Sequence, residues 1–99
     1  PVVDFVKIDA EGADKIVLEG MRGLIERNPA LKLVIEANPS SLKSAGTSIE
    51  ELFSLLSELG FRQVDVLFGK MESYRIPRDT TGLLEIVKSR GYTDLFCQP

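Results

Sequence analysis

Apolar residues recur along the chain in two alternating patterns. Short apolar runs, which are typical of buried strands, cover residues 1–8, 31–37 and 95–97. Residues 61–68 alternate apolar and polar side chains, as in a strand with one wetter face. Between these runs, apolar residues recur at every third or fourth position, as on one face of a helix, over residues 13–28, 49–59 and 83–90. Strands and helices in this order predict an α/β sheet whose parallel strands are joined by helical crossovers.

The first run, Pro1 to Ile8, has apolar side chains on both faces, which is typical of a strand in the covered interior of a parallel sheet. Lys7 interrupts this run, and we expect its long side chain to extend outward to water. Ligands of such sheets bind at the carboxyl ends of the strands. Residues 9–11, residues 36–38 and the loop after Phe68 therefore form the expected functional edge.

Two segments carry neither pattern. Asn38-Pro39-Ser40 breaks the chain after the second predicted strand. Residues 69–82 are predicted to form a loop, which is long for a compact domain. Such a loop could cover an acceptor substrate, pack as an arm on a second copy, or be a plain mobile loop. The sequence leaves these three interpretations open.

The composition excludes several classes of function. The chain has 99 residues, a formal net charge of -3, no His and a single cysteine, Cys97. Without His the chain contains no Ser-His-Asp triad, no Cys-His pair and no zinc-ligand cluster. The acidic balance argues against nucleic-acid and anionic-membrane partners, and no apolar run approaches the ~18 residues of a membrane span. One cysteine fits a reducing, cytoplasmic location, and we interpret Cys97 as a small apolar strand residue.

One motif points to a known family. Residues 4–14, which read DFVKIDAEGAD, resemble the DFIKIDVEGAE signature of the FkbM-type S-adenosylmethionine-dependent methyltransferases. Residues 17–20 continue the likeness with VLEG, and residues 33–36 are similar to the family's strand that ends in IE. Residues 52–61 and 95–96 resemble its next helix and strand and its final strand. The first motif is distinctive, whereas the later ones carry weight through their order.

The resemblance implies a class I methyltransferase fold with a Rossmann-like sheet in the order 3-2-1-4-5-7-6. On that mapping, residues 1–99 form a single partial domain, the C-terminal half, with strands equivalent to 4, 5, 6 and 7 and the last strand antiparallel. The family's other half carries a glycine-rich loop and an acidic residue that bind the cofactor. Neither GxGxxG nor GxGxG occurs in this chain. S-adenosylmethionine is thus the cofactor of the intact family, but we do not expect this chain to bind it alone.

The resemblance also implies site residues. Asp9, Glu11 and Glu36 would be catalytic, Asp9, Ala10 and Glu11 would contact the cofactor, and no metal ligand is assigned. A carboxylate there could orient the cofactor, accept a proton from a hydroxyl substrate or bind a metal ion, although methyl transfer depends mainly on alignment. The alternatives are structural. Glu11 and Asp14 would stabilise the start of a helix, and Glu36 would be a partly exposed residue at a strand end.

The first strand would lack the neighbour that strand 1 provides in the complete fold. An apolar edge of this kind pairs with another chain, so we expect a homodimer through Pro1 to Ile8, antiparallel across a two-fold axis, or a separate N-terminal half. The expected function is the C-terminal portion of an O-methyltransferase for a small hydroxylated substrate, inactive as an isolated chain. The alternatives are a non-catalytic, self-associating methyltransferase-like module and an excised piece with no independent role.

Overall fold

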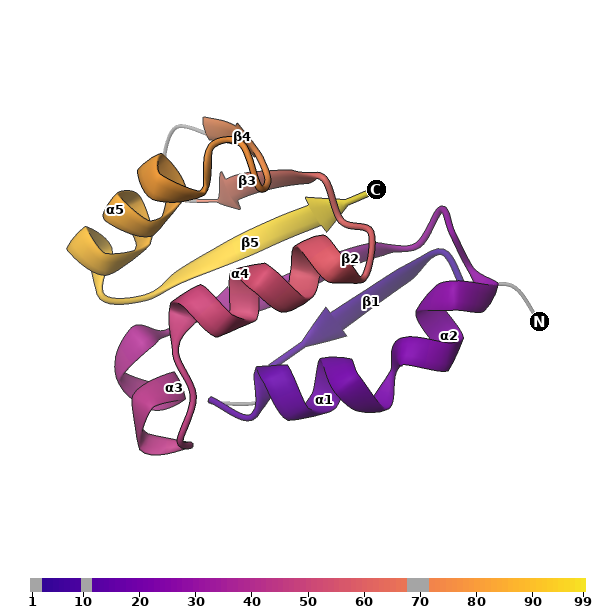
Figure 1. Ribbon diagram of the computed structural model, residues 1–99, viewed down its shortest axis with the longest axis horizontal. Coiled ribbons are helices and arrows are strands. Elements are labelled where there is room, and N and C mark those ends of the chain that lie inside the picture. The colour runs from indigo at the N-terminus through magenta and orange to yellow at the C-terminus, as the bar shows by residue number, and fades with distance from the viewer. Residues whose placement is uncertain (1–2, 10–11, 68–71) are drawn as a thin grey trace.

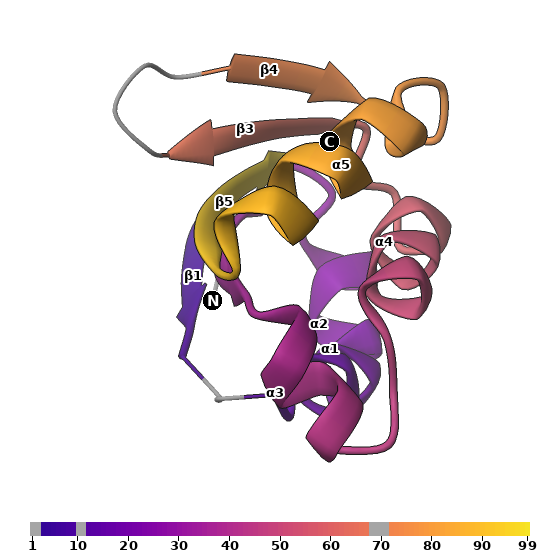
Figure 2. The ribbon, with the colours of Figure 1, turned by 90° about the vertical axis from the view of Figure 1, so that its left-hand side faces the viewer.

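The computed structural model describes residues 3–9, 12–67 and 72–99. Within these ranges the chain forms one five-stranded sheet, and the helices lie against one of its faces (Figures 1 and 2). The strands are β1 (Phe5–Ile8), β2 (Lys32–Ala37), β3 (Gln63–Leu67), β4 (Glu72–Arg75) and β5 (Thr93–Gln98). The helices are α1 (Asp14–Gly20), α2 (Arg22–Arg27), α3 (Pro39–Ser44), α4 (Ile49–Glu58) and α5 (Thr80–Arg90).

The strand order is β1-β2-β5-β3-β4. β1 and β2 are parallel, whereas β5 lies antiparallel between β2 and β3, and β4 is antiparallel to β3. This mixed sheet confirms the α/β class and is compatible with part of a Rossmann-like methyltransferase fold, in which the last strand runs antiparallel. The expectation from periodicity alone, that the strands are parallel, is wrong for β5. The reason is that β4 is antiparallel to β3 and returns the chain to the end of the sheet where β3 begins. α5 then leads to the opposite end of the sheet, so β5 runs antiparallel to both β2 and β3.

The segment after β3 is more regular than the predicted loop over residues 69–82. Its described part contains β4, whose residues alternate between partly buried and exposed positions, and α5 already begins at Thr80. Tyr74 of β4 lies opposite Val64 of β3, and its side chain packs against the buried core. Since β4 has few apolar residues and only one neighbour among the described strands, no apolar run announces it.

Two further predictions, both for the chain between β1 and α4, are wrong. The predicted break at residues 38–40 is instead the start of α3, because the Asn38 side chain accepts a hydrogen bond from the Ser41 N–H and caps the helix. The single helix predicted over residues 13–28 is divided into α1 and α2 at Met21.

β1 is shorter than the predicted strand and is covered on one face only. Ile8 is buried, whereas the Phe5 side chain is 55% exposed and Lys7 extends into solvent as predicted. Among the described strands β1 pairs with β2 alone and ends the sheet. The expected position of β1 at a sheet edge is therefore confirmed, but the expectation of an interior strand covered on both faces is wrong.

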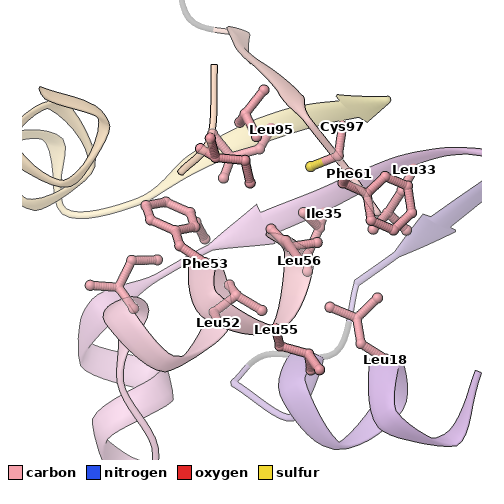
Figure 3. Close-up of a cluster of buried hydrophobic side chains, with 14 of the residues drawn as sticks. Leu18, Leu33, Ile35, Leu52, Phe53, Leu55, Leu56, Phe61, Leu95 and Cys97 are labelled. Atoms are coloured by element: carbon pink, nitrogen blue, oxygen red, sulfur yellow. The ribbon is translucent and has the colours of Figure 1, made fainter. Parts of the chain in front are cut away.

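The hydrophobic core lies between the sheet and the helices. In Figure 3, Leu52, Phe53 and Leu56 of α4 point toward the sheet, where Ile35 and Leu95 meet them. Full burial of each such side chain contributes about 1.5–3 kcal/mol. Cys97 belongs to this core, as predicted, and its burial raises the pKa of the thiol far above its usual range, which leaves it unreactive.

No helix in the described part of the chain has both the length and the apolar character that a membrane crossing requires.

Candidate active site

The carboxyl ends of the parallel strands β1 and β2 meet at one edge of the sheet. The last residue pair between the two strands is Ile8 with Ile35. Asp9 directly follows Ile8, and Glu36 directly follows Ile35. Asp9 is exposed and Glu36 is half-buried. We call this edge, with Asp9 and Glu36, the rim. The structure therefore places two of the three carboxylates that the sequence singled out at the same edge of the sheet.

A third carboxylate, which the sequence reasoning missed, joins the rim from β5. Asp94 lies directly opposite Glu36 in the antiparallel pair, and its side chain is exposed. Carboxylates directly opposite each other in a sheet repel, so this arrangement concentrates negative charge at the rim. No local signal identifies Asp94, because its strand was predicted only from residues 95–97 and its pairing depends on the strand order.

Gly12 fixes the loop that leads from β1 to α1. Its φ of +100° is a conformation that residues with a side chain rarely adopt. A Cβ on Gly12 would collide with the carbonyl oxygen of Ser41 and would lie 2.8 Å from the Ser41 carbonyl carbon. The Gly12 backbone therefore packs on the backbone of the first turn of α3, and only glycine permits that approach.

Asp14 anchors the same loop from the other side. Its side chain is 1% exposed, and its Oδ1 accepts a hydrogen bond from the Gly12 N–H at 3.1 Å. Its Oδ2 is buried and has no hydrogen-bond partner within the described residues. Burial raises the pKa of Asp14, and the charge of Asp9 raises it further, although hydrogen bonds from the backbone N–H groups of Asp14 and Gly12 oppose this. Sequence reasoning placed Asp14 at the helix start but did not predict its burial.

The remaining candidates, Ala10 and Glu11, lie outside the described residues. Among the residues that the structure places, no three acidic, His or Cys side chains come close enough together to hold a metal ion. The described part of the site thus comprises Asp9 and Glu36 at the carboxyl ends of β1 and β2, Asp94 opposite Glu36, and the start of α1 held by Gly12 and Asp14.

Two cavities lie away from the rim. One, of about 280 Å³, is lined by Ile25, Leu31 and Phe61, near the amino end of β2 and therefore at the opposite edge of the sheet. The other, of about 380 Å³, lies between α1 and α4 and is lined mostly by charged side chains, among them Lys15 and Glu58. Neither cavity is lined by a rim residue.

Comparison with known proteins agrees with the motif. A family model described as the methyltransferase FkbM domain matches residues 1–63, which include β1, β2, α4 and the rim residues Asp9 and Glu36. Searches of curated proteins and of solved structures found no match. The family model matches more than half of the chain, and the sheet is compatible with part of this fold. The chain belongs to the FkbM methyltransferase domain family.

Proposed function

We propose that this chain is the C-terminal portion of an S-adenosylmethionine-dependent O-methyltransferase that acts on a small hydroxylated substrate. The observation that carries the proposal is the position of Asp9 and Glu36. Each directly follows the last residue pair of β1 with β2, Ile8 with Ile35, and both lie within the segment that matches the methyltransferase family. Ligands of α/β sheets bind at this edge.

The rim suits the charge of the methyl donor. S-adenosylmethionine, when bound, would supply an electrophilic methyl group on a positively charged sulfur. Asp9, Glu36 and Asp94 provide negative charge where such a cation would be favoured, and a carboxylate within reach of the acceptor hydroxyl can take up its proton. The chain does not fit the whole cofactor, because its sequence contains no glycine-rich loop whose backbone could approach the methionine part.

We therefore propose that a separate segment supplies the glycine-rich loop and that the chain alone does not bind the cofactor. The test is complementation. The chain is mixed with a methyltransferase segment that carries a glycine-rich loop and ends before the DFVKIDAEGAD motif. Transfer of a radiolabelled methyl group from S-adenosylmethionine is then measured on a panel of small hydroxylated acceptors.

Variants at the rim make this test specific. We expect Asp9→Asn and Glu36→Gln each to lower the transfer rate at least tenfold, while Asp4→Asn, an exposed acid at the other end of β1, leaves it unchanged. A complemented assembly that binds S-adenosylmethionine but transfers no methyl group would overturn the proposal. So would rates in both rim variants that equal the rate with the parent chain.

A second candidate function is a non-catalytic, self-associating module, which the free edge of β1 and the exposed Phe5 side chain favour. This candidate predicts self-association without any methyl transfer after complementation. Calorimetric titration of the purified chain with S-adenosylmethionine adds a second criterion. Saturable binding by the chain alone would exclude the module, and it would also overturn the proposal that a separate segment must supply the glycine-rich loop.

A further inference from the structure

The segments that leave the two parallel strands at the rim contact each other. Gly12 lies three positions after Asp9, and Ser41 lies in the first turn of α3, five positions after Glu36. A Cβ on Gly12 would overlap the Ser41 carbonyl oxygen, so the two backbones are in direct contact. Figures 1 and 2 show α3 near the end at which α1 begins. We call this contact between Gly12 and Ser41 the clamp.

One side chain holds the backbone of each half of the clamp. The Asp14 Oδ1 accepts a hydrogen bond from the Gly12 N–H at 3.1 Å. The Asn38 Oδ1 accepts one from the Ser41 N–H, also at 3.1 Å. In both halves a side-chain oxygen binds the backbone N–H of the residue that makes the contact. Asp14 therefore orients one half of the clamp, and Asn38 orients the other.

Buried side chains fix both halves of the clamp to the rest of the fold. Leu42, next to Ser41 in α3, is buried in the hydrophobic core, and Leu18 anchors α1 in the same core. Protein interiors are close-packed, so a shift of either helix would disturb the packing of its buried leucine. The clamp is therefore held in place by the core as well as by its two hydrogen bonds.

The stability of α1 does not by itself account for the burial of Asp14. An acid stabilises a helix start from an exposed position as well. Asp14 is instead buried, and its Oδ2 has no hydrogen-bond partner within the described residues. Burying a carboxylate oxygen without a partner costs free energy, and local rules of this kind are broken mainly where a residue serves function. What the buried position provides is the hydrogen bond that orients Gly12.

We propose that Asp14 and Asn38 are positioning residues for methyl transfer. Through the clamp they set the position of Asp9 relative to Glu36. This inference rests on the proposed function, because it concerns the same two carboxylates at the rim. Asp14 and Asn38 touch neither cofactor nor acceptor in this role, and they act only through the backbones that they orient.

The sheet itself does not extend far enough to fix this spacing. The register of β1 with β2 ends at the pair Ile8 and Ile35, and each rim carboxylate comes one residue later. Contacts between the segments that follow the strands must therefore hold the two carboxylates at a constant separation. Catalysis by alignment is sensitive to such separation, because a misplacement of about 1 Å can lower a rate about a hundredfold.

Amide hydrogen exchange in the isolated chain tests the clamp without any methyl transfer. Asn38→Ala removes the hydrogen bond to Ser41, and it should also speed exchange of the Gly12 amide about threefold or more, because Gly12 then packs on a loosened helix start. Ser48→Ala is the matched control, since Ser48 caps α4 through a hydrogen bond of the same length, 3.1 Å. It should leave the Gly12 amide unchanged. Unchanged exchange of the Gly12 amide in Asn38→Ala would overturn the clamp.

Kinetics of the complemented assembly test the positioning role. Rates are expressed per S-adenosylmethionine bound, so that a loss of folded protein does not lower them. Asp14→Ala and Asn38→Ala should each lower kcat about tenfold and leave the KM of the acceptor near its parent value. Asp14→Asn and Asn38→Asp should restore the rate, because each keeps a side-chain oxygen for the same N–H. Ser48→Ala should keep the parent rate.

The double variant shows whether the two residues act through one contact. Asp14→Ala combined with Asn38→Ala should lose about as much kcat as the more affected single variant, whereas independent effects would multiply. Multiplied losses, or a loss in Asp14→Asn as large as in Asp14→Ala, would overturn the positioning role. An assembly that is inactive even with the parent chain would overturn the proposed function and with it the role in methyl transfer, while exchange of the Gly12 amide would still decide whether the clamp exists.

Discussion

Gly12 and Asp14 hold the loop after β1 by two different means. Gly12 acts sterically, because the absence of a side chain lets its backbone contact α3. Asp14 acts electrostatically, because its side chain accepts a hydrogen bond from the Gly12 N–H. Both residues belong to the motif that resembles the methyltransferase family, yet neither was assigned to the site. Their positions show that part of this motif fixes the backbone at the start of α1.

The steric requirement at Gly12 can be measured against another glycine. Gly12→Ala should destabilise the chain through its positive φ, at about 1–2 kcal/mol, and through the collision with Ser41, at a further 1–3 kcal/mol or so. Gly46→Ala is the control, because Gly46 also has a positive φ but has open space around it. Urea unfolding of the two variants gives the difference. Equal losses would show that the contact with Ser41 contributes nothing.

The buried Asp14 carboxyl makes stability depend on pH. Its pKa is raised in the folded chain, so the folded state binds the proton more tightly than the unfolded state does. The contribution of Asp14 to stability is therefore complete below the unfolded pKa of 3.8 and falls as pH rises from there through the folded pKa. Asp14→Asn should remove this decrease while its side-chain oxygen still accepts the Gly12 N–H.

Unfolding free energies of the parent chain and Asp14→Asn between pH 3 and pH 7 test this effect. As pH rises, the unfolding free energy of Asp14→Asn should increase relative to that of the parent chain. Asp4→Asn is the control for removal of an exposed acid. A difference between Asp14→Asn and the parent that is constant over this pH range would contradict the raised pKa.

At the scale of elements, periodicity predicted those that bury a long apolar stripe and missed those that do not. α4 was predicted well because its buried residues recur at helical spacing and Ser48 begins it. α3 was missed because it buries only Leu42 in six residues and depends on the Asn38 cap. β4 was missed because its pairing with β3, rather than its own composition, makes it a strand.

The cap of α4 provides a test at this scale. The Ser48 side chain accepts a hydrogen bond from the Glu51 N–H at 3.1 Å, which satisfies one of the free donors at the helix start. Ser48→Ala should cost about 1 kcal/mol of unfolding free energy. Ser54→Ala, on the exposed side of the same helix, should be neutral or slightly stabilising because alanine is the better helix former. A loss at Ser54 as large as at Ser48 would show that the cap is not the cause.

At the scale of the whole molecule, the sequence predicted the α/β class and an edge position for β1. The antiparallel last strand followed only from the family resemblance, because no local pattern encodes the direction of β5 relative to β2. Asp9 and Glu36 were singled out through the family resemblance and their places near the carboxyl ends of buried strands, whereas Asp94 depends on a strand order that periodicity does not contain.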